Sequence, residues 1–138
     1  MLAPERDQSS TREAIKEIEI FLLRFPNSPL MPEGRKIERE AKDRLSEAGY
    51  RVGFFYFRSR YYPGAIDRFR EVLQTDPAFT RRDAVYYYMA EALRLYTPPR
   101  PAEALPYYDR LLKEFEKSDY LENARKRIAE LKAAGGGW

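Results

Sequence analysis

One apolar pattern occurs three times along this chain of 138 residues, and it limits the possible folds more than any other feature. Each copy begins with an alanine and continues with apolar side chains at i+1, i+4, i+7 and i+8. This spacing follows one face of a helix and does not fit the alternation of a strand. The copies are Ala14, Ile15, Ile18, Phe21 and Leu22; Ala65, Ile66, Phe69, Val72 and Leu73; and Ala104, Leu105, Tyr108, Leu111 and Leu112. The repetition predicts an all-α fold made of amphipathic helices.

The middle copy also matches a known repeat motif. The residues that match tetratricopeptide repeats in type and offset are Gly53 and Tyr56 in a first helix, followed by Tyr62, Ala65, Phe69 and Pro77. Small residues at the Gly53 and Ala65 positions let the two helices of a hairpin approach closely. Pro77 would stop the second helix because proline has no N–H. The resemblance implies a tetratricopeptide-like superhelix of antiparallel helix hairpins with a C-terminal capping helix.

The spacing of the copies predicts a single repeat domain over residues 1–134. Its expected parts are the second helix of a partial repeat at 10–26, a repeat with an elongated first helix at 30–77, a repeat at 80–116 and a capping helix at 119–133. Residues 135–138 are expected to form a flexible tail. Because the first part has no partner helix before it, we expect the chain to be a fragment without its first repeat.

Local signals refine the helix boundaries. Ser10 with Glu13 predicts a capping box at the start of the first helix. Thr80 with Asp83 predicts a cap at the start of a later helix. Pro106 lies inside the helix that follows Pro101, so we expect a kink or a shifted start there.

The composition excludes several kinds of chemistry. Cysteine and histidine are absent, which removes thiolate nucleophiles, imidazole bases and the usual ligands of zinc, copper and iron. The net charge of +3 comes from interleaved basic and acidic residues, which argues against a nucleic-acid partner. Glu91 could lie beside Tyr87 in a cleft, but one carboxylate alone is weak evidence for catalysis. We expect no enzyme, no cofactor and no metal site.

Three further segments resemble the BamD family of outer-membrane assembly lipoproteins. They are the Asp7-Gln8-x-x-Thr11 element with its continuation to Ile15, the run Phe25-Pro26-Asn27-Ser28-Pro29, and Tyr50-Arg51-Val52-Gly53-Phe54-Phe55-Tyr56. The resemblance implies a part of the machinery that folds β-barrel precursors, in contact with a barrel-shaped core subunit and with unfolded outer-membrane protein precursors. Family members are tethered at the periplasmic face of the outer membrane by an acylated N-terminal cysteine. We expect the signal and this lipid anchor to be missing from the chain and the fragment itself to be soluble.

The first helices of stacked repeats line the inner, concave wall of a superhelix, and this selects candidate binding residues. The residues that the repeat register points inward are Tyr50, Phe54, Phe57 and Arg58 in the middle repeat, and Tyr87, Glu91 and Arg94 in the next. Such a surface would suit an extended peptide with aromatic side chains and a free carboxylate, held by stacking and by arginine.

Two of these assignments have alternatives. Tyr50, Phe54 and Phe57 could instead be core residues, because aromatic side chains at helical spacing often pack inside a protein. The run of three tyrosines at 86–88 cannot be wholly core, since consecutive helical residues point about 100° apart. At least one of the three is expected to be exposed or to touch a partner.

The function also has alternatives. An unrelated tetratricopeptide adaptor could bind a different peptide or protein through the same kind of surface. A helical RNA-binding repeat is less consistent with the interleaved charges. In addition, an uncovered apolar end of the repeat array could form a homodimer.

Overall fold

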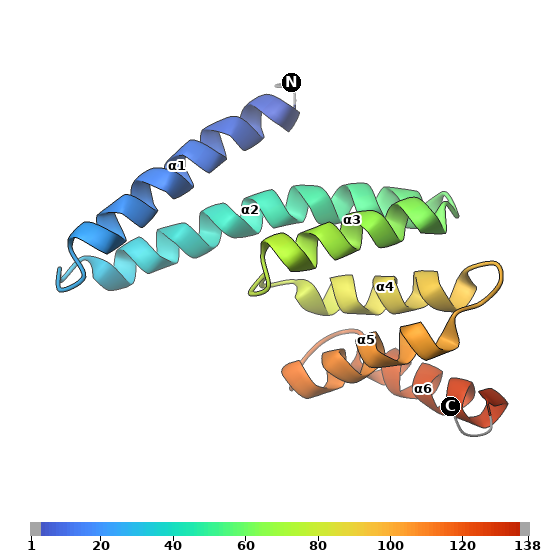
Figure 1. Cartoon of the computed structure of the whole chain (residues 1–138). Helices are drawn as coiled ribbons and strands as arrows, with labels where there is room; N and C mark the ends of the chain where they lie inside the picture. The colour runs from blue at the N-terminus through green and yellow to red at the C-terminus, as the bar shows by residue number, and fades with distance from the viewer. Residues whose placement is uncertain (1–3, 136–138) are drawn as a thin grey trace. The chain divides into compact units, whose positions relative to one another are not determined.

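The computed structural model describes residues 4–135, and this part of the chain contains six α-helices and no strand (Figure 1). The helices are α1 (Pro4–Arg24), α2 (Met31–Arg58), α3 (Tyr62–Thr75), α4 (Arg82–Leu95), α5 (Pro101–Glu114) and α6 (Leu121–Gly135). The predicted all-α, tetratricopeptide-like fold is confirmed. Of the expected tail, Gly135 is the last residue of α6, and 136–138 lie outside the described residues.

Backbone contacts divide the chain into two compact units. Unit 1 extends to Ala48 and contains α1 and the first part of α2. Unit 2 begins at Gly49 and contains the last part of α2 together with α3, α4, α5 and α6.

In unit 1, α1 and α2 form a hairpin through the turn at residues 25–30. Ser28 organises this turn, because its hydroxyl accepts a hydrogen bond from the Leu30 N–H at 3.1 Å and its carbonyl accepts one from the Met31 N–H at 3.0 Å. Gly34 allows close approach of α1, since a Cβ there would lie 3.1 Å from a methyl carbon of Leu22. The structure corrects the predicted helix start. α1 begins at Pro4, so Ser10 lies inside the helix and does not cap its first turn.

In unit 2, the end of α2 packs closely on α3. A Cβ at Gly53 would lie 2.6 Å from the ring of Phe69, and a Cβ at Gly49 would lie 2.8 Å from a methyl group of Val72. Phe69 is fully buried. Gly49 and Gly53 therefore make room for the core side chains of α3, and Gly53 is the small position of the repeat motif.

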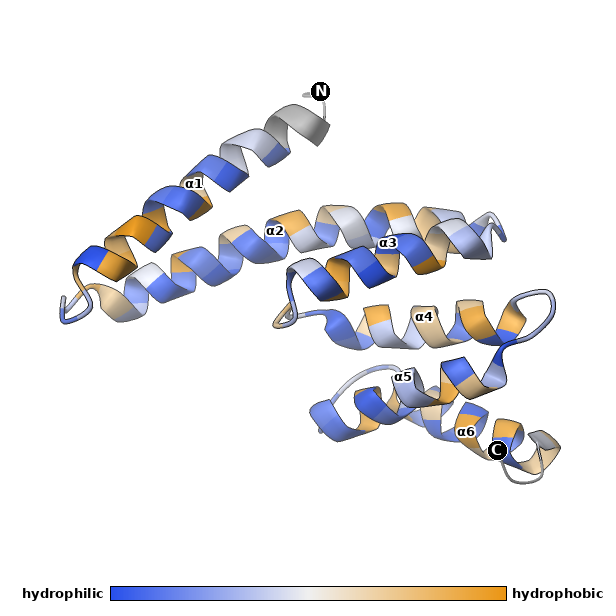
Figure 2. Ribbon diagram, in the orientation of Figure 1, coloured by the Kyte–Doolittle hydropathy of each residue, from blue (hydrophilic) through white to orange (hydrophobic). Residues whose placement is uncertain are grey.

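Helix α4 lies at the centre of the unit 2 core. Hydrophobic positions recur along it in Figure 2, and most of its residues are buried. The largest fully buried side chains of the core are Tyr86, Tyr108, Phe69, Phe79 and Met89. On the next helix, α5 starts at Pro101 without the expected shift and continues through Pro106 to Glu114. Pro106 removes one backbone hydrogen bond from this helix.

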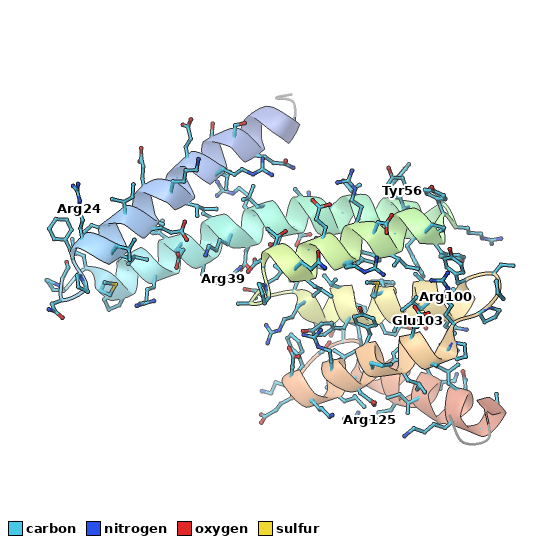
Figure 3. The ribbon with its side chains drawn as sticks, in the orientation of Figure 1. Arg24, Arg39, Tyr56, Arg100, Glu103 and Arg125 are labelled. Atoms are coloured by element: carbon cyan, nitrogen blue, oxygen red, sulfur yellow. The ribbon has the colours of Figure 1, made fainter. Side chains whose placement is uncertain are left out.

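The α2–α3 turn has a left-handed residue that is not glycine. Arg60 has a φ of 62°, and the Tyr61 N–H donates to the Tyr56 carbonyl at 2.9 Å. The rings of Tyr56 and Tyr61 meet edge to face with centroids 5.5 Å apart. This bond and this apolar contact are typical of a helix end that usually carries glycine at the left-handed position. Figure 3 shows Tyr56 beside this turn, near the end of α2.

Candidate binding surface

Five aromatic side chains from three parts of unit 2 form a continuous surface, which we call the aromatic wall. They are Tyr50, Phe54 and Phe57 of α2, Tyr88 of α4, and Tyr120, which directly precedes α6. The Tyr88 ring centroid lies 4.9 Å from that of Phe54, 5.2 Å from that of Phe57 and 5.6 Å from that of Tyr120. Such separations are typical of favourable aromatic pairs, so the wall is held together by its own ring contacts.

Next to the wall, a hollow of about 440 Å³ runs along α2. It is lined by Tyr50, Arg51, Phe54, Phe55, Arg58 and Ser59. These residues form two neighbouring rows on one helix, since residues four positions apart lie on the same face. Phe55 is 65% exposed, and Arg58 is also exposed. The hollow therefore combines accessible aromatic surface with positive charge.

Two arginines flank the wall. The guanidinium carbon of Arg58 lies 6.0 Å from the Phe54 ring centroid, and that of Arg81 lies 5.0 Å from the Tyr50 ring centroid. Cations over aromatic rings are attracted by the ring quadrupole, and this holds the guanidinium close to the apolar surface. Both arginines are exposed. Arg58 can therefore donate hydrogen bonds to a carboxylate without leaving the Phe54 ring.

The residues predicted to face a groove differ in accessibility. Tyr50, Tyr87 and Glu91 are only 6%, 7% and 5% exposed, so they are buried. Phe54, Phe57 and Arg94 are partly buried, and Arg58 is exposed. Only the second group therefore has side-chain surface that a ligand could reach.

The three tyrosines at 86–88 divide between core and surface. Tyr86 is fully buried, and its hydroxyl donates to a carboxylate oxygen of Glu114 at 2.8 Å. Tyr87 is buried, whereas Tyr88 retains partial exposure. Tyr88 is thus the member of this run that reaches the wall.

Glu91 is the centre of a polar cluster that joins three helices. Arg94 donates two hydrogen bonds to its carboxylate, at 2.9 and 3.0 Å, and the Tyr108 hydroxyl of α5 donates another. Arg127 of α6 forms an ion pair with it at 3.4 Å. Burial alone would raise the pKa of Glu91, but the hydrogen bonds from Arg94 and Tyr108 and the charges of both arginines lower it.

The cluster makes Glu91 a structural carboxylate. Its oxygens are held by neighbours within the protein, and its lowered pKa keeps it ionised at neutral pH. A general acid needs the opposite shift. Among residues 8–135, whose side chains the structure describes, no group of three or more acidic side chains is arranged to hold a metal ion.

Sequence reasoning missed Tyr88 and Tyr120. The tyrosine run indicated that one of its members would be accessible, but not which one. Tyr120 lies outside the repeat register, in the connection between α5 and α6, so no periodic signal identifies it.

Comparison with known families gave a match over residues 1–105 to the family model YfiO, described as "Outer membrane lipoprotein". A search of curated proteins gave no match. None of the helices formed by residues 4–135 is both long enough and apolar enough to cross a membrane.

Proposed function

The chain belongs to the YfiO family of outer membrane lipoproteins, and from this premise we propose that it is a non-catalytic scaffold of the BamD kind. Its task would be to bind other polypeptides during assembly of outer-membrane β-barrels. The proposed partners are the barrel-shaped core subunit and unfolded outer-membrane protein precursors. The proposed location is the periplasmic face of the outer membrane.

The aromatic wall with its two arginines is the observation that carries this proposal. Phe54, Phe57 and Tyr88 offer ring surface to apolar or aromatic side chains of a ligand. Arg58 and Arg81 supply positive charge beside these rings. The buried carboxylate of Glu91 is already neutralised by Arg94 and Arg127. The surface therefore suits an extended polypeptide with aromatic side chains and a free carboxylate.

Each of the predicted binding residues would have a role in holding such a polypeptide. Phe54 and Phe57 would stack against side chains of the ligand, and Arg58 would hold its carboxylate. The buried rings of Tyr50 and Tyr87 would support the accessible members of the wall from the core. Glu91 would fix Arg94 in place, so that Arg94 borders the surface.

Calorimetric titration with a short peptide that ends in an aromatic residue tests the proposal. We expect saturable binding by the free acid and about tenfold weaker binding by the C-terminal amide, because the amide removes a charge-assisted contact. Arg58→Gln should reduce this difference between the peptides. Arg70→Gln is the matched control, since Arg70 is an exposed arginine of α3 paired with Asp67 at 3.5 Å.

The result of this titration also distinguishes the proposed function from the alternative one. Binding of neither peptide would contradict the proposed surface. A second titration then uses the periplasmic domains of a barrel-assembly core subunit. Failure of both titrations would favour an unrelated tetratricopeptide adaptor with another partner.

Self-association is a second candidate property, and it concerns unit 1. The exposed large apolar side chains of this unit are Ile20, Leu23, Phe25, Leu30 and Ile37, and Leu23 is 82% exposed. Exposed apolar patches often mark protein contacts, so two copies could pair through unit 1. Sedimentation velocity over a range of concentrations would reveal a dimer, and a monomer at every concentration would contradict it.

A further inference from the structure

The connection between α5 and α6 is tied to the start of α4. The Ser118 hydroxyl donates a hydrogen bond to a carboxylate oxygen of Asp83 at 2.6 Å. The same hydroxyl accepts a hydrogen bond from the Tyr120 N–H at 3.2 Å. Because Ser118 is bound on both sides, Tyr120 has a defined position next to α4.

This position brings the Tyr120 ring against two tyrosines of α4. It stacks on Tyr87, with centroids 5.0 Å apart and planes inclined by 23°, and it meets Tyr88 edge to face at 5.6 Å. Tyr120 remains partly exposed, as does Tyr88. The pair therefore contributes to the accessible part of the aromatic wall.

Tyr50, Tyr88 and Tyr120 each bring a hydroxyl to this otherwise aromatic surface. Burial raises the pKa of Tyr88 to about 12, and the neighbouring Tyr120 adds to this shift. Burial also raises the pKa of Tyr50. Both phenols thus keep their protons at neutral pH, and a protonated phenol can donate and accept hydrogen bonds.

The position of Tyr120 also depends on the docking of α6. Leu121 and Ala124, in the first turn of α6, are buried in the core. Arg127, further along the same helix, pairs with Glu91 of α4 at 3.4 Å. If α6 left the core, the residue directly before it could not keep its contacts with Tyr87 and Tyr88.

We infer that Tyr120 is a ligand-contacting residue of the aromatic wall, and that binding of an extended polypeptide is coupled to the docking of α6. The inference rests on the proposed function and extends it to the C-terminal helix. Ring faces of the wall receive apolar side chains, while the hydroxyls of Tyr88 and Tyr120 pair with main-chain N–H and C=O groups of the ligand. Main-chain recognition of this kind suits unfolded polypeptides of varied sequence, because every residue offers the same backbone groups.

Coupling between two events is reciprocal. If docked α6 strengthens ligand binding, then bound ligand must stabilise docked α6 by the same factor. The inference therefore makes two measurable claims, one about the affinity of the wall and one about the opening of α6.

The first test compares Tyr120→Phe with Tyr107→Phe in titrations with the aromatic, carboxylate-ended peptide. Tyr120→Phe keeps the ring contacts and removes one hydroxyl, so we expect binding to weaken about fivefold. Tyr107 is a partly buried tyrosine of α5 outside the wall, and its variant should bind as the unaltered chain does. Equal affinity of Tyr120→Phe and the unaltered chain would overturn the role of Tyr120.

The second test measures amide hydrogen exchange in α6 with and without saturating peptide. We expect slower exchange over residues 121–135 when the peptide is bound, and unchanged exchange there would overturn the coupling. Both of these contradicting outcomes can be distinguished from failure of the proposed function itself. In that case the unaltered chain would not bind the peptide at all, and both the proposal and this inference would be wrong.

Discussion

The two units use the same apolar pattern with different results. Ala65 and Ala104, the first residues of the two copies in unit 2, are fully buried, whereas the equivalent Ala14 in unit 1 is exposed. Four residues after the alanine of each copy, Phe69 is fully buried and Ile18 is only partly buried. The pattern therefore specifies an amphipathic helix in each case, but packing of neighbouring helices decides how much of its apolar face becomes core.

The units also differ in how they hold charge. In unit 1, Lys42 forms ion pairs with Glu19 and Glu38 at 3.6 and 3.4 Å, and all three side chains retain exposure. In unit 2, Glu91 is buried among arginines and a tyrosine. Exposed pairs contribute little to stability because water and salt screen them, whereas breaking a buried pair leaves a charge without a partner.

The largest expected effect comes from truncating equivalent positions of the pattern. Phe69→Ala should lower the free energy of unfolding by about 4 kcal/mol, because it leaves a cavity in the core of unit 2. Ile18→Ala should cost about 1 kcal/mol, since its side chain is already partly in water. Urea unfolding followed by circular dichroism measures both. Equal costs would contradict the contrast between the units.

Removing a negative charge should give the next largest difference in stability between the two units. Glu91→Gln should cost about 3 kcal/mol at neutral pH, because it leaves Arg94 and Arg127 without their shared carboxylate. Glu19→Gln in unit 1 should cost less than about 0.5 kcal/mol. Thermal unfolding of both variants at low salt compares them directly, and a Glu91→Gln variant as stable as Glu19→Gln would show that the cluster does not stabilise the fold.

The same carboxylate predicts a pH dependence. The native pKa of Glu91 lies below its ordinary value of 4.5, so the native state binds fewer protons than the unfolded state in that range. Its stabilising effect is complete above the unfolded pKa and is lost as the pH falls through the lowered native pKa. Between neutral pH and acid, the unaltered chain should therefore lose its stability advantage over Glu91→Gln. An advantage that stays constant down to acid pH would contradict the lowered pKa.

Adding a Cβ where two helices approach closely should have a smaller effect on the free energy of unfolding. Gly53→Ala places a Cβ 2.6 Å from the buried Phe69 ring, and we expect a loss of about 2 kcal/mol from overpacking. Gly34→Ala in unit 1 meets the end of the Leu22 side chain at 3.1 Å, and this end can move. Because alanine also favours helix by about 1 kcal/mol, Gly34→Ala should be close to neutral. Urea unfolding of both variants measures whether Gly53→Ala loses more stability than Gly34→Ala, and the opposite result would contradict this prediction.

The smallest expected effect is a gain in stability. Arg60→Gly removes a side chain from a left-handed residue and should stabilise the chain by about 1 kcal/mol. Ser59→Gly is the control, since Ser59 does not have a positive φ and should gain nothing. If Arg60→Gly lowers the melting temperature instead, the arginine side chain makes a contribution that outweighs the backbone strain.

Sequence reasoning predicted the all-α fold well because amphipathic helices depend on local spacing. The Gly53–Phe69 contact follows from the motif, and the structure contains it. Sequence reasoning could not predict which of the inward-facing residues would be accessible to a ligand. Tyr50 and Tyr87 follow the register, but ring contacts with Phe69 and Tyr108 bury them.

Contacts between distant residues explain the remaining differences. Nothing near Glu91 in the sequence indicates its pairing with Arg127, which requires α6 to bring this arginine within reach of α4. Likewise, Tyr120 joins the wall because Ser118 bonds to Asp83, and no periodic pattern relates these residues. Such arrangements arise from tertiary packing and become visible only in the folded chain.

The central claim is that unit 2, through its aromatic wall, binds polypeptide. Photo-crosslinking tests it most directly, with a carboxylate-ended peptide that carries a photoreactive aromatic residue. We expect crosslinks to Phe54, Phe57, Tyr88 or neighbouring residues of unit 2, and we expect excess unlabelled peptide to compete for them. Saturable crosslinks confined to residues 4–48 of unit 1 would contradict it.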